Sequence, residues 1–257
     1  MFAFHRVQEL IADLCVLDAS IRRQEIKWDR DDRQIIVLCH SGLSNKLNAV
    51  YARQLSKKLK NGKYQYLNNE LPLRLGIEAD KVANIFKGLA ERGVSKFGCI
   101  KFMTPSGGNK DKLLQEADII LATSGMCDNG ASQDYFEMMK GSASNSILIT
   151  GFQSSGSVGR KLVDGELDML SCFADVYDIS RSYSAHGDQA KLMANIFSLG
   201  DYASQAKTAT VFINHGDVES KVALQSKIKQ IGEEKRSNYR TIGDVLIATD
   251  KWFDLNK

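Results

Sequence analysis

Short apolar runs alternate along this sequence with longer segments in which apolar residues recur at helical spacing. The runs are rich in β-branched residues and indicate strands, whereas the longer segments indicate amphipathic helices. Most of the runs are apolar throughout, which predicts strands covered on both faces. The predicted strands are Gln34–Cys39, Asp118–Thr123, Ser146–Thr150, Ala174–Ile179, Thr208–Asn214 and Gly243–Ala248.

The predicted helices fall between these strands. They cover Val7–Arg22, Lys46–Leu59, Asp80–Arg92, Ser132–Lys140, Gln189–Leu199 and Val218–Gly232. Gly93 and Gly200 follow two of them, where glycine commonly ends a helix. Segment 64–76 has no clear pattern, and we expect a partly extended excursion or a short strand there. Strands that alternate with helices predict an α/β fold, a parallel sheet with helices on both faces.

Composition narrows the class of protein. With 257 residues, of which 43% are hydrophobic, the chain can bury one large core or two modest ones. The longest apolar runs are too short to span a membrane and the first one carries charge, so we expect neither a span nor a secretory signal, and a cytoplasmic location. The five cysteines stand singly in the sequence, and we expect them to be reduced.

The formal net charge of +3 is too small to indicate nucleic-acid binding by itself. Basic residues nevertheless gather in two places. We expect both clusters to be solvated faces of amphipathic helices. The clusters are Arg53, Lys57, Lys58, Lys60 and Lys63, and Lys227, Lys229, Lys235 and Arg236.

Small and polar residues follow directly on two predicted strands, in segments Thr123–Gly130 and Gly151–Arg160. Open α/β sheets bind ligands at the carboxyl ends of their strands, so both segments are candidate sites. Gly151 and Gly156 have the spacing of a phosphate loop, but Ser157 stands where the lysine is required, which excludes that class of triphosphatase. The second segment is either a tight turn or a turn whose free backbone N–H groups bind a phosphate, including that of RNA.

Two histidines occur in similar surroundings. His186 and His215 are each followed by Gly-Asp at the predicted start of a helix. Asp188 and Asp217 are suited to capping those helices, and a lone histidine is more often structural than catalytic. The residues alone leave a structural and a functional role open.

Several short motifs follow one another in a characteristic order. They are SGM…NG (124–130), TGFQSSGSVGRKLVDG (150–165), SYSAHGDQ (182–189) and VFINHGD (211–217). Together with FAFHRVQELI (2–11), they resemble the β-CASP family of the metallo-β-lactamase superfamily, which includes RNA endonucleases and exonucleases. The resemblance covers nearly the whole chain.

The resemblance implies that residues 1–182 form an N-terminally incomplete β-CASP domain and that residues 183–257 form the last piece of a metallo-β-lactamase αββα domain. It implies that His186 is catalytic, as a general acid or phosphate ligand, and that His215 binds zinc. Two zinc ions in the complete family site polarise the phosphate and generate hydroxide near neutral pH. The implied partner is RNA, and the implied substrate-binding residues are Ser124, Gly125, Gln153, Gly156, Arg160, Ser184 and Asp188.

The sequence also departs from the family. It contains no His-x-His pair, and it has four histidines in all. Because catalytic zinc usually takes about three protein ligands, we do not expect this chain to hold the dinuclear site alone. His5 replaces a usual glycine and His40 stands where Asp is common, and we expect both to be loop substitutions without consequence.

The sequence leaves three hypotheses for the function of this chain. The leading hypothesis is part of a zinc-dependent ribonuclease that does not cleave RNA by itself. The alternatives are a non-catalytic RNA-binding or assembly module, and a half-enzyme completed in trans by an N-terminal metallo-β-lactamase chain. The last alternative predicts exposed apolar surface on the C-terminal piece, and an isolated chain that is oligomeric or aggregates.

Overall fold

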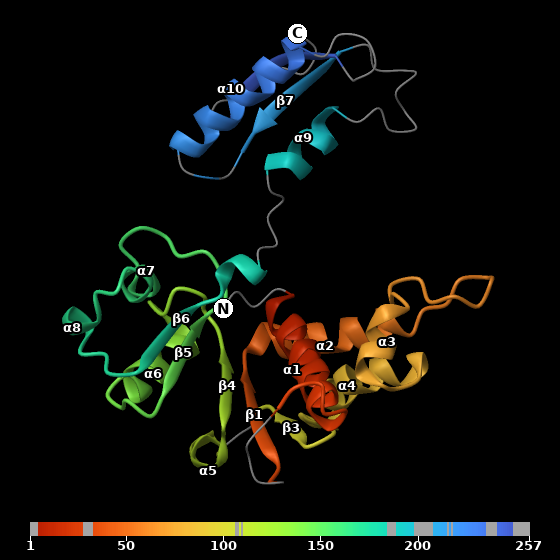
Figure 1. Cartoon of the computed structure of the whole chain (residues 1–257), viewed down its shortest axis with the longest axis vertical. Helices are drawn as coiled ribbons and strands as arrows, with labels where there is room; N and C mark the ends of the chain where they lie inside the picture. Colours follow the sequence, from red (N-terminus) through yellow and green to blue (C-terminus); the bar gives the residue numbers. More distant parts are fainter. Residues whose placement is uncertain are drawn as a thin grey trace. The chain divides into compact units, whose positions relative to one another are not determined.

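The computed structural model describes residues 5–27, 33–105, 108, 110–183, 189–197, 208–214, 216, 218–234 and 241–248. The chain divides into two compact units, Met1–Ser184 and Ala185–Lys257 (Figure 1). The described helices of unit 1 are α1 (Arg6–Arg22), α2 (Gly42–Leu55), α3 (Glu70–Leu75), α4 (Ala79–Arg92), α5 (Lys110–Glu116), α6 (Gly130–Met139), α7 (Val158–Val163) and α8 (Leu167–Leu170). Its described strands are β1 (Ile35–His40), β2 (Val94–Phe97), β3 (Ile100–Met103), β4 (Ile119–Ala122), β5 (Ser146–Ile149) and β6 (Asp175–Asp178).

The main sheet of unit 1 has four strands in the order β2-β3-β1-β4. β1 lies parallel to both β3 and β4, while β2 and β3 form an antiparallel hairpin. The predicted α/β class with a mainly parallel sheet is therefore confirmed. The hairpin is an addition that the apolar pattern did not predict.

Helices cover both faces of this sheet. The burial of β1 shows this, since alternate residues of a strand point to opposite faces. Val37 and Cys39 are buried in a core that includes residues of α1 and α4. Leu38 is buried on the other side, against residues of α5 and α6. Figure 1 shows these two groups of helices on either side of β1 and β4.

β5 and β6 form a separate parallel pair. Ile149 packs on one side with Phe136 of α6 and Leu162 of α7. On the other side, Leu148 and Tyr177 are direct cross-strand partners, and they are 55% and 53% exposed. The expectation that the apolar strands are covered on both faces is therefore wrong for this pair.

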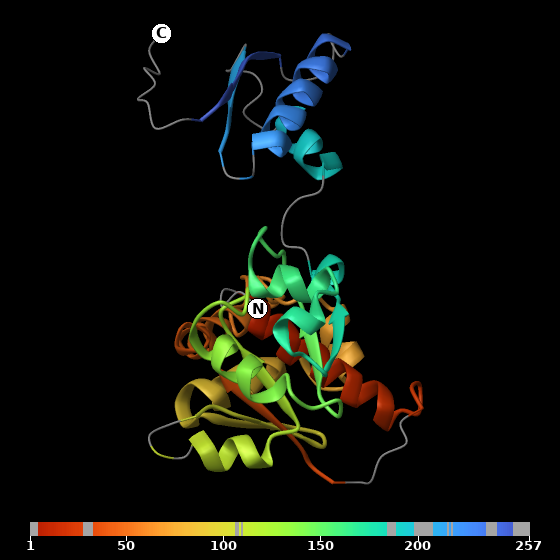
Figure 2. The same cartoon turned by 90° about the vertical axis from the view of Figure 1, so that its left-hand side faces the viewer.

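Unit 2 contains α9 (Gln189–Phe197), β7 (Ala209–Ile213), α10 (Val218–Glu234) and β8 (Ile242–Ile247). β7 and β8 are parallel, and α10 packs against β8 (Figure 2). Its buried core consists of Phe197, Ile213, Ile228 and Val245, one residue from each element.

All six predicted helices and all six predicted strands overlap observed ones. Gly93 ends α4 with a φ of 66°, in the left-handed region that favours glycine, whereas Gly200 lies outside the described residues. Segment 64–76 contains α3 besides an isolated bridge between Tyr64 and Lys58. None of the helices in the described ranges has the length and apolar character that crossing a membrane requires.

The first basic cluster does not form a helix face. α2 ends at Leu55, so only Arg53 of that cluster is helical. Residues 57–66, named here the basic hairpin, fold back so that Lys58 pairs with Tyr64. The expectation of a solvated helix face is wrong for this segment. In the second cluster Lys229 is exposed and Lys227 is half-buried on α10, and Lys235 and Arg236 lie outside the described residues.

Candidate functional site

Two turns of unit 1 contain four of the predicted site residues, and a fifth lies in the helix that follows. The first turn, Thr123–Gly130, follows β4 and opens α6, and the second turn, Gly151–Ser157, follows β5 and opens α7. The two turns are in direct contact. Ser124 and Gly125 belong to the first turn, Gly156 belongs to the second, and Arg160 follows in α7.

Gln153 joins the two turns. Its side-chain Nε2 donates to the carbonyl oxygen of Gly125 at 3.0 Å and to that of Gly151 at 2.8 Å. The residue is 4% exposed, so its amide is directed into the protein. Its position therefore suits holding the turns together more than reaching a ligand at the surface.

Gly159 lets α7 approach this contact closely. Its backbone N–H donates to the carbonyl oxygen of Met126 at 2.8 Å. A Cβ at position 159 would lie 2.7 Å from Cδ of Gln153, and closer still to the neighbouring Oε1. Only glycine fits between α7 and the Gln153 amide without displacing it.

The first amides of α7 already have acceptors within the protein. Val158 N–H donates to Oδ1 of Asp128 at 2.7 Å, and Arg160 N–H donates to Oγ of Ser157 at 3.0 Å. With the Gly159 bond to Met126, all three are engaged. The expectation of free N–H groups for a phosphate is therefore wrong for these residues, and the tight-turn interpretation fits them.

Gly156 and Arg160 are the accessible members of the set. Gly156 has a φ of 82° and nothing lies within 4 Å of the position its Cβ would take. Arg160 Nε donates to Oδ2 of Asp164 at 2.8 Å, and a second guanidinium nitrogen contacts Oδ1. This hydrogen-bonded pair lowers the pKa of the Asp164 carboxyl and raises the pKa of Arg160.

The remaining predicted site residues, Ser184, His186, Asp188 and His215, lie outside the described residues. In the part of the chain that the structure describes, His, Cys, Asp and Glu side chains nowhere gather in groups of three or more that could hold a metal ion.

Tyr183, which immediately precedes the SAHGD motif, is held by α1. Its hydroxyl donates to Oδ2 of Asp13 at 2.8 Å, and the Arg6 guanidinium carbon lies 5.2 Å from its ring centroid. Burial first, and then the bond to Asp13, raise the pKa of the Tyr183 hydroxyl. A cavity of about 310 Å³ borders these residues and Glu9. Sequence reasoning missed this cluster, although Arg6 and Tyr183 both belong to recognised motifs.

The two substituted histidines each contact a tyrosine. His5 Nδ1 lies 2.6 Å from the hydroxyl of Tyr51, and His40 Nδ1 lies 2.8 Å from that of Tyr135. His5 also has a φ of 64°, in the left-handed region where glycine is favoured. His40 is the last residue of β1, so the expectation of a loop position is wrong for it. That the two substitutions are without consequence stays a prediction.

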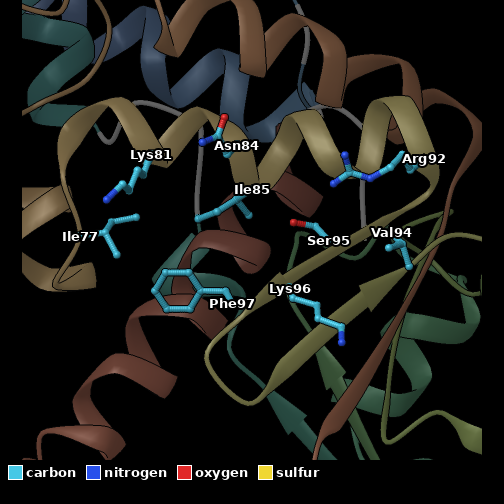
Figure 3. Close-up of a pocket in the computed structure, with 9 residues that line it drawn as sticks. All are labelled: Ile77, Lys81, Asn84, Ile85, Arg92, Val94, Ser95, Lys96 and Phe97. Atoms are coloured by element: carbon cyan, nitrogen blue, oxygen red, sulfur yellow. The ribbon is translucent and has the colours of Figure 1, made fainter.

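A cavity of about 490 Å³ lies between α4 and β2, away from the predicted site residues in the sequence (Figure 3). Apolar residues such as Ile85 and Phe97 line it together with the cations Lys81, Arg92 and Lys96. Lys81 is paired with Glu78 at 2.9 Å. Sequence reasoning did not identify this cavity, because β2 was not predicted.

Comparison with known proteins identifies relatives of this sequence. Residues 7–162 match the Beta-Casp domain. Transcription termination factor FttA of Methanosarcina mazei is 26% identical over 67% of this chain and 26% of its own length. Integrator complex subunit 11 of Gallus gallus is 23% identical over 90% of this chain and 32% of its own length, and RNase aCSPSF2 of Saccharolobus solfataricus is 25% identical over 49% and 25%. The chain thus spans about a quarter to a third of the length of these relatives.

Proposed function

Because this chain belongs to the β-CASP family of metallo-β-lactamase RNA nucleases, we propose that it is part of a zinc-dependent ribonuclease and binds RNA. In this proposal residues 1–182 are the β-CASP domain and residues 183–257 are the last piece of the hydrolase domain. The relatives carry the names of an RNase, a termination factor and an Integrator subunit, which supports an RNA ligand.

The observation that carries the proposal is the bond from Gln153 to Gly125. It joins two of the motifs on which the family resemblance rests, at the carboxyl ends of two strands, where α/β folds bind ligands. Gly156 and Arg160 are the accessible groups beside it, and we propose that they contact the RNA, with Ser124 nearby. Gln153 and Gly125 then act by holding the turns in place.

Zinc is proposed for the complete family site, with His215 as one ligand and His186 beside the phosphate. We propose that the residues of this chain do not supply a full set of ligands. The sequence has four histidines, and the described part of the chain brings together no group of three metal-binding side chains. Catalytic zinc usually takes about three protein ligands. We therefore propose that this chain alone does not cleave RNA.

A binding and cleavage experiment on the purified chain tests this proposal. A fluorescently labelled single-stranded oligouridine is titrated with the chain, with and without added zinc, and the RNA is then examined on a denaturing gel. We expect salt-dependent binding and intact RNA in both cases. Absence of binding at about 50 mM salt would refute RNA binding. Zinc-dependent cleavage by the chain alone would refute the incomplete site.

The exposed face of β5 and β6 favours a second candidate function, that of an assembly subunit. Leu148 and Tyr177 form an apolar pair on this face, and Phe173 beside β6 is 67% exposed. Exposed apolar groups that gather on one face often mark protein interfaces. If assembly is the function, light scattering shows self-association or binding to a separately expressed N-terminal half. Replacing Leu148 and Tyr177 by Gln then abolishes that association. A wild-type chain that is a monodisperse monomer and does not bind the N-terminal half contradicts the assembly function.

A further inference from the structure

The basic hairpin is the centre of a long segment without acidic residues. Between Arg33 and Asn69 the sequence has no Asp or Glu, although the whole chain has 31 of them against 34 Lys and Arg. The net charge of +3 therefore conceals a strong local surplus of positive charge. Its cations concentrate at Arg53, Lys57, Lys58, Lys60 and Lys63.

The hairpin has a defined backbone conformation. The N–H of Leu59 donates to the carbonyl oxygen of Lys63 at 2.8 Å, and the N–H of Gln65 donates to that of Lys57 at 2.9 Å. At the tip, Gly62 has a φ of 79° and Lys63 N–H donates to Oδ1 of Asn61 at 3.0 Å. Figure 1 shows this segment, in orange between α2 and α3, projecting from unit 1. Its lysines are thus presented from a fixed scaffold.

The lysines of the hairpin have no acidic partner within the described part of the chain. Every residue from Ser56 to Lys63 is exposed. The ion pairs that form between described residues include neither Arg53 nor any of the four lysines. This contrasts with Lys81, Lys87, Lys112 and Lys140, which are each paired with a glutamate.

Two aromatic rings lie among these cations. Lys57 Nζ is 5.8 Å from the ring centroid of Tyr66, and Lys58 Nζ is 4.9 Å from that of Tyr64. Tyr66 is 56% exposed, whereas Tyr64 packs partly against the core. A cation beside an accessible aromatic ring suits one nucleotide unit, because the ring stacks on a base while the ammonium group contacts a phosphate.

We propose that the basic hairpin is an additional binding site for single-stranded RNA, in which Lys57, Lys60 and Lys63 contact phosphates and Tyr66 stacks on an unpaired base. This inference rests on the proposed RNA-binding function. It adds a site outside the two turns of the motif region. Single-stranded RNA is favoured over duplex, because stacking on a side chain requires an unpaired base. An acidic protein would satisfy the lysines but has no base to stack on Tyr66.

Charge-neutralised variants of the full chain test the hairpin. The hairpin variant carries Lys57→Gln, Lys60→Gln and Lys63→Gln, and Lys58 is retained because it covers Tyr64. The control variant carries Arg92→Gln, Lys96→Gln and Lys101→Gln, which remove the same charge from α4, β2 and β3. The affinity for an oligouridine of about 20 nucleotides is measured by fluorescence anisotropy between about 50 and 200 mM salt.

We expect the hairpin variant to bind about tenfold more weakly at the lower salt concentration, with a salt slope smaller by about 2, since each lost phosphate contact removes about 0.7. The control variant should keep most of the wild-type slope. Tyr66→Leu should weaken binding by at least about fivefold with an unchanged slope, because stacking is not ionic. Hydrogen exchange of residues 57–66 in the wild-type chain should slow when RNA is added, a readout that needs no variant.

The possible failures are distinguishable. If the wild-type chain binds the oligouridine and the hairpin variant binds equally well, the hairpin site is refuted while the proposed function stands. If the hairpin and control variants lose the same affinity for the oligouridine, a localised site is refuted, and the RNA is bound by positive charge spread over the surface. If poly-glutamate displaces the RNA at equal charge and Tyr66→Leu has no effect, the hairpin is a site for acidic proteins. If the wild-type chain does not bind RNA, the proposed function fails as well.

Discussion

Gln153 donates a hydrogen bond to the carbonyl oxygen of Gly125 across 3.0 Å, although the two residues are 28 positions apart in the sequence. The bond joins the turn after β4 to the turn after β5. Only 4% of Gln153 is exposed, so few solvent molecules can replace this bond if it is lost.

Replacing Gln153 by Ala should therefore destabilise unit 1. The carbonyl oxygens of Gly125 and Gly151 would lose their donor in a buried setting, which costs about 1–3 kcal/mol. Urea denaturation measures the loss. Ser155→Ala is the control, because Ser155 is exposed in the same turn, and it should change stability by less than about 0.5 kcal/mol. If the Gln153 variant is as stable as the wild type, Gln153 does not stabilise the contact between the two turns.

Gly159→Ala tests the close approach of α7 to the same side chain. The added methyl group would collide with the Gln153 amide and lie 3.2 Å from the carbonyl oxygen of Met126, at a cost of about 1–3 kcal/mol. In the double variant Gln153→Ala/Gly159→Ala the main collision is absent. The two losses measured by urea denaturation should therefore be non-additive by about 1 kcal/mol. Strict additivity would show that Gly159 serves some other purpose.

Asp128 caps α7 from the neighbouring turn, and its removal should weaken that helix. Asp128→Ala leaves the Val158 N–H without its acceptor at 2.7 Å and should cost about 0.5–2 kcal/mol. Asp128→Asn keeps an acceptor oxygen and should lose less than half as much. Chemical denaturation and the exchange rate of the Val158 amide report the difference. Equal losses in the two variants would indicate that the charge of Asp128 matters and its oxygen does not.

Of the four strands of the main sheet, the sequence predicted the two that are mostly apolar. β1 is apolar up to His40 and lies between β3 and β4, so its composition reflects covering on both faces. β4 is apolar throughout, although it is the last strand of this sheet. β2 and β3 were not predicted, because Lys96 and Lys101 interrupt the apolar runs of these two strands. Lys96 lies on the edge strand β2, where charge is tolerated, and faces Lys101 of β3 across the hairpin.

The candidate site was predictable only in part. Small and polar residues after a buried strand indicated the two turns, because that pattern is local. The roles of Gln153 and Asp128 depend on which segments pack together, and no spacing within one turn contains that information. The backbone of His5 was also not predictable, since a histidine in the sequence gives no indication of a left-handed φ.

Cys99 should react slowly with alkylating agents at mildly alkaline pH. Burial, followed by a hydrogen bond to Asp18 at 2.8 Å, raises the pKa of its thiol to about 11. Since an ordinary thiol ionises near 9.0, Cys99 should hold about 100-fold less thiolate than an ordinary thiol at pH 8 and react correspondingly more slowly with iodoacetamide. Mass spectrometry of the modified chain measures this rate, with Cys99→Ser as the control that identifies the adduct.

The same pKa difference has a consequence for stability. The thiol is held in its neutral form more tightly in the folded chain than in the unfolded chain. Its stabilising contribution is therefore complete below pH 9 and is lost as the pH rises towards about 11. Cys99→Ser should make the unfolding midpoint less dependent on pH in this window. A wild-type midpoint that is flat from pH 9 to 11 contradicts the raised pKa.

Arg160 and Asp164 provide paired variants for the proposed RNA contact beside the second turn. Arg160→Gln removes one cation and should lower the salt slope of RNA binding by about 0.7. Asp164→Asn removes the carboxylate that accepts from Arg160 Nε at 2.8 Å, so the guanidinium becomes available to a phosphate and the affinity should rise by about twofold. Lys161→Gln, the adjacent cation, is the control for general charge. If Arg160→Gln and Asp164→Asn both leave the anisotropy titration unchanged, Arg160 serves only its ion pair within α7, and the contact must be sought at other residues.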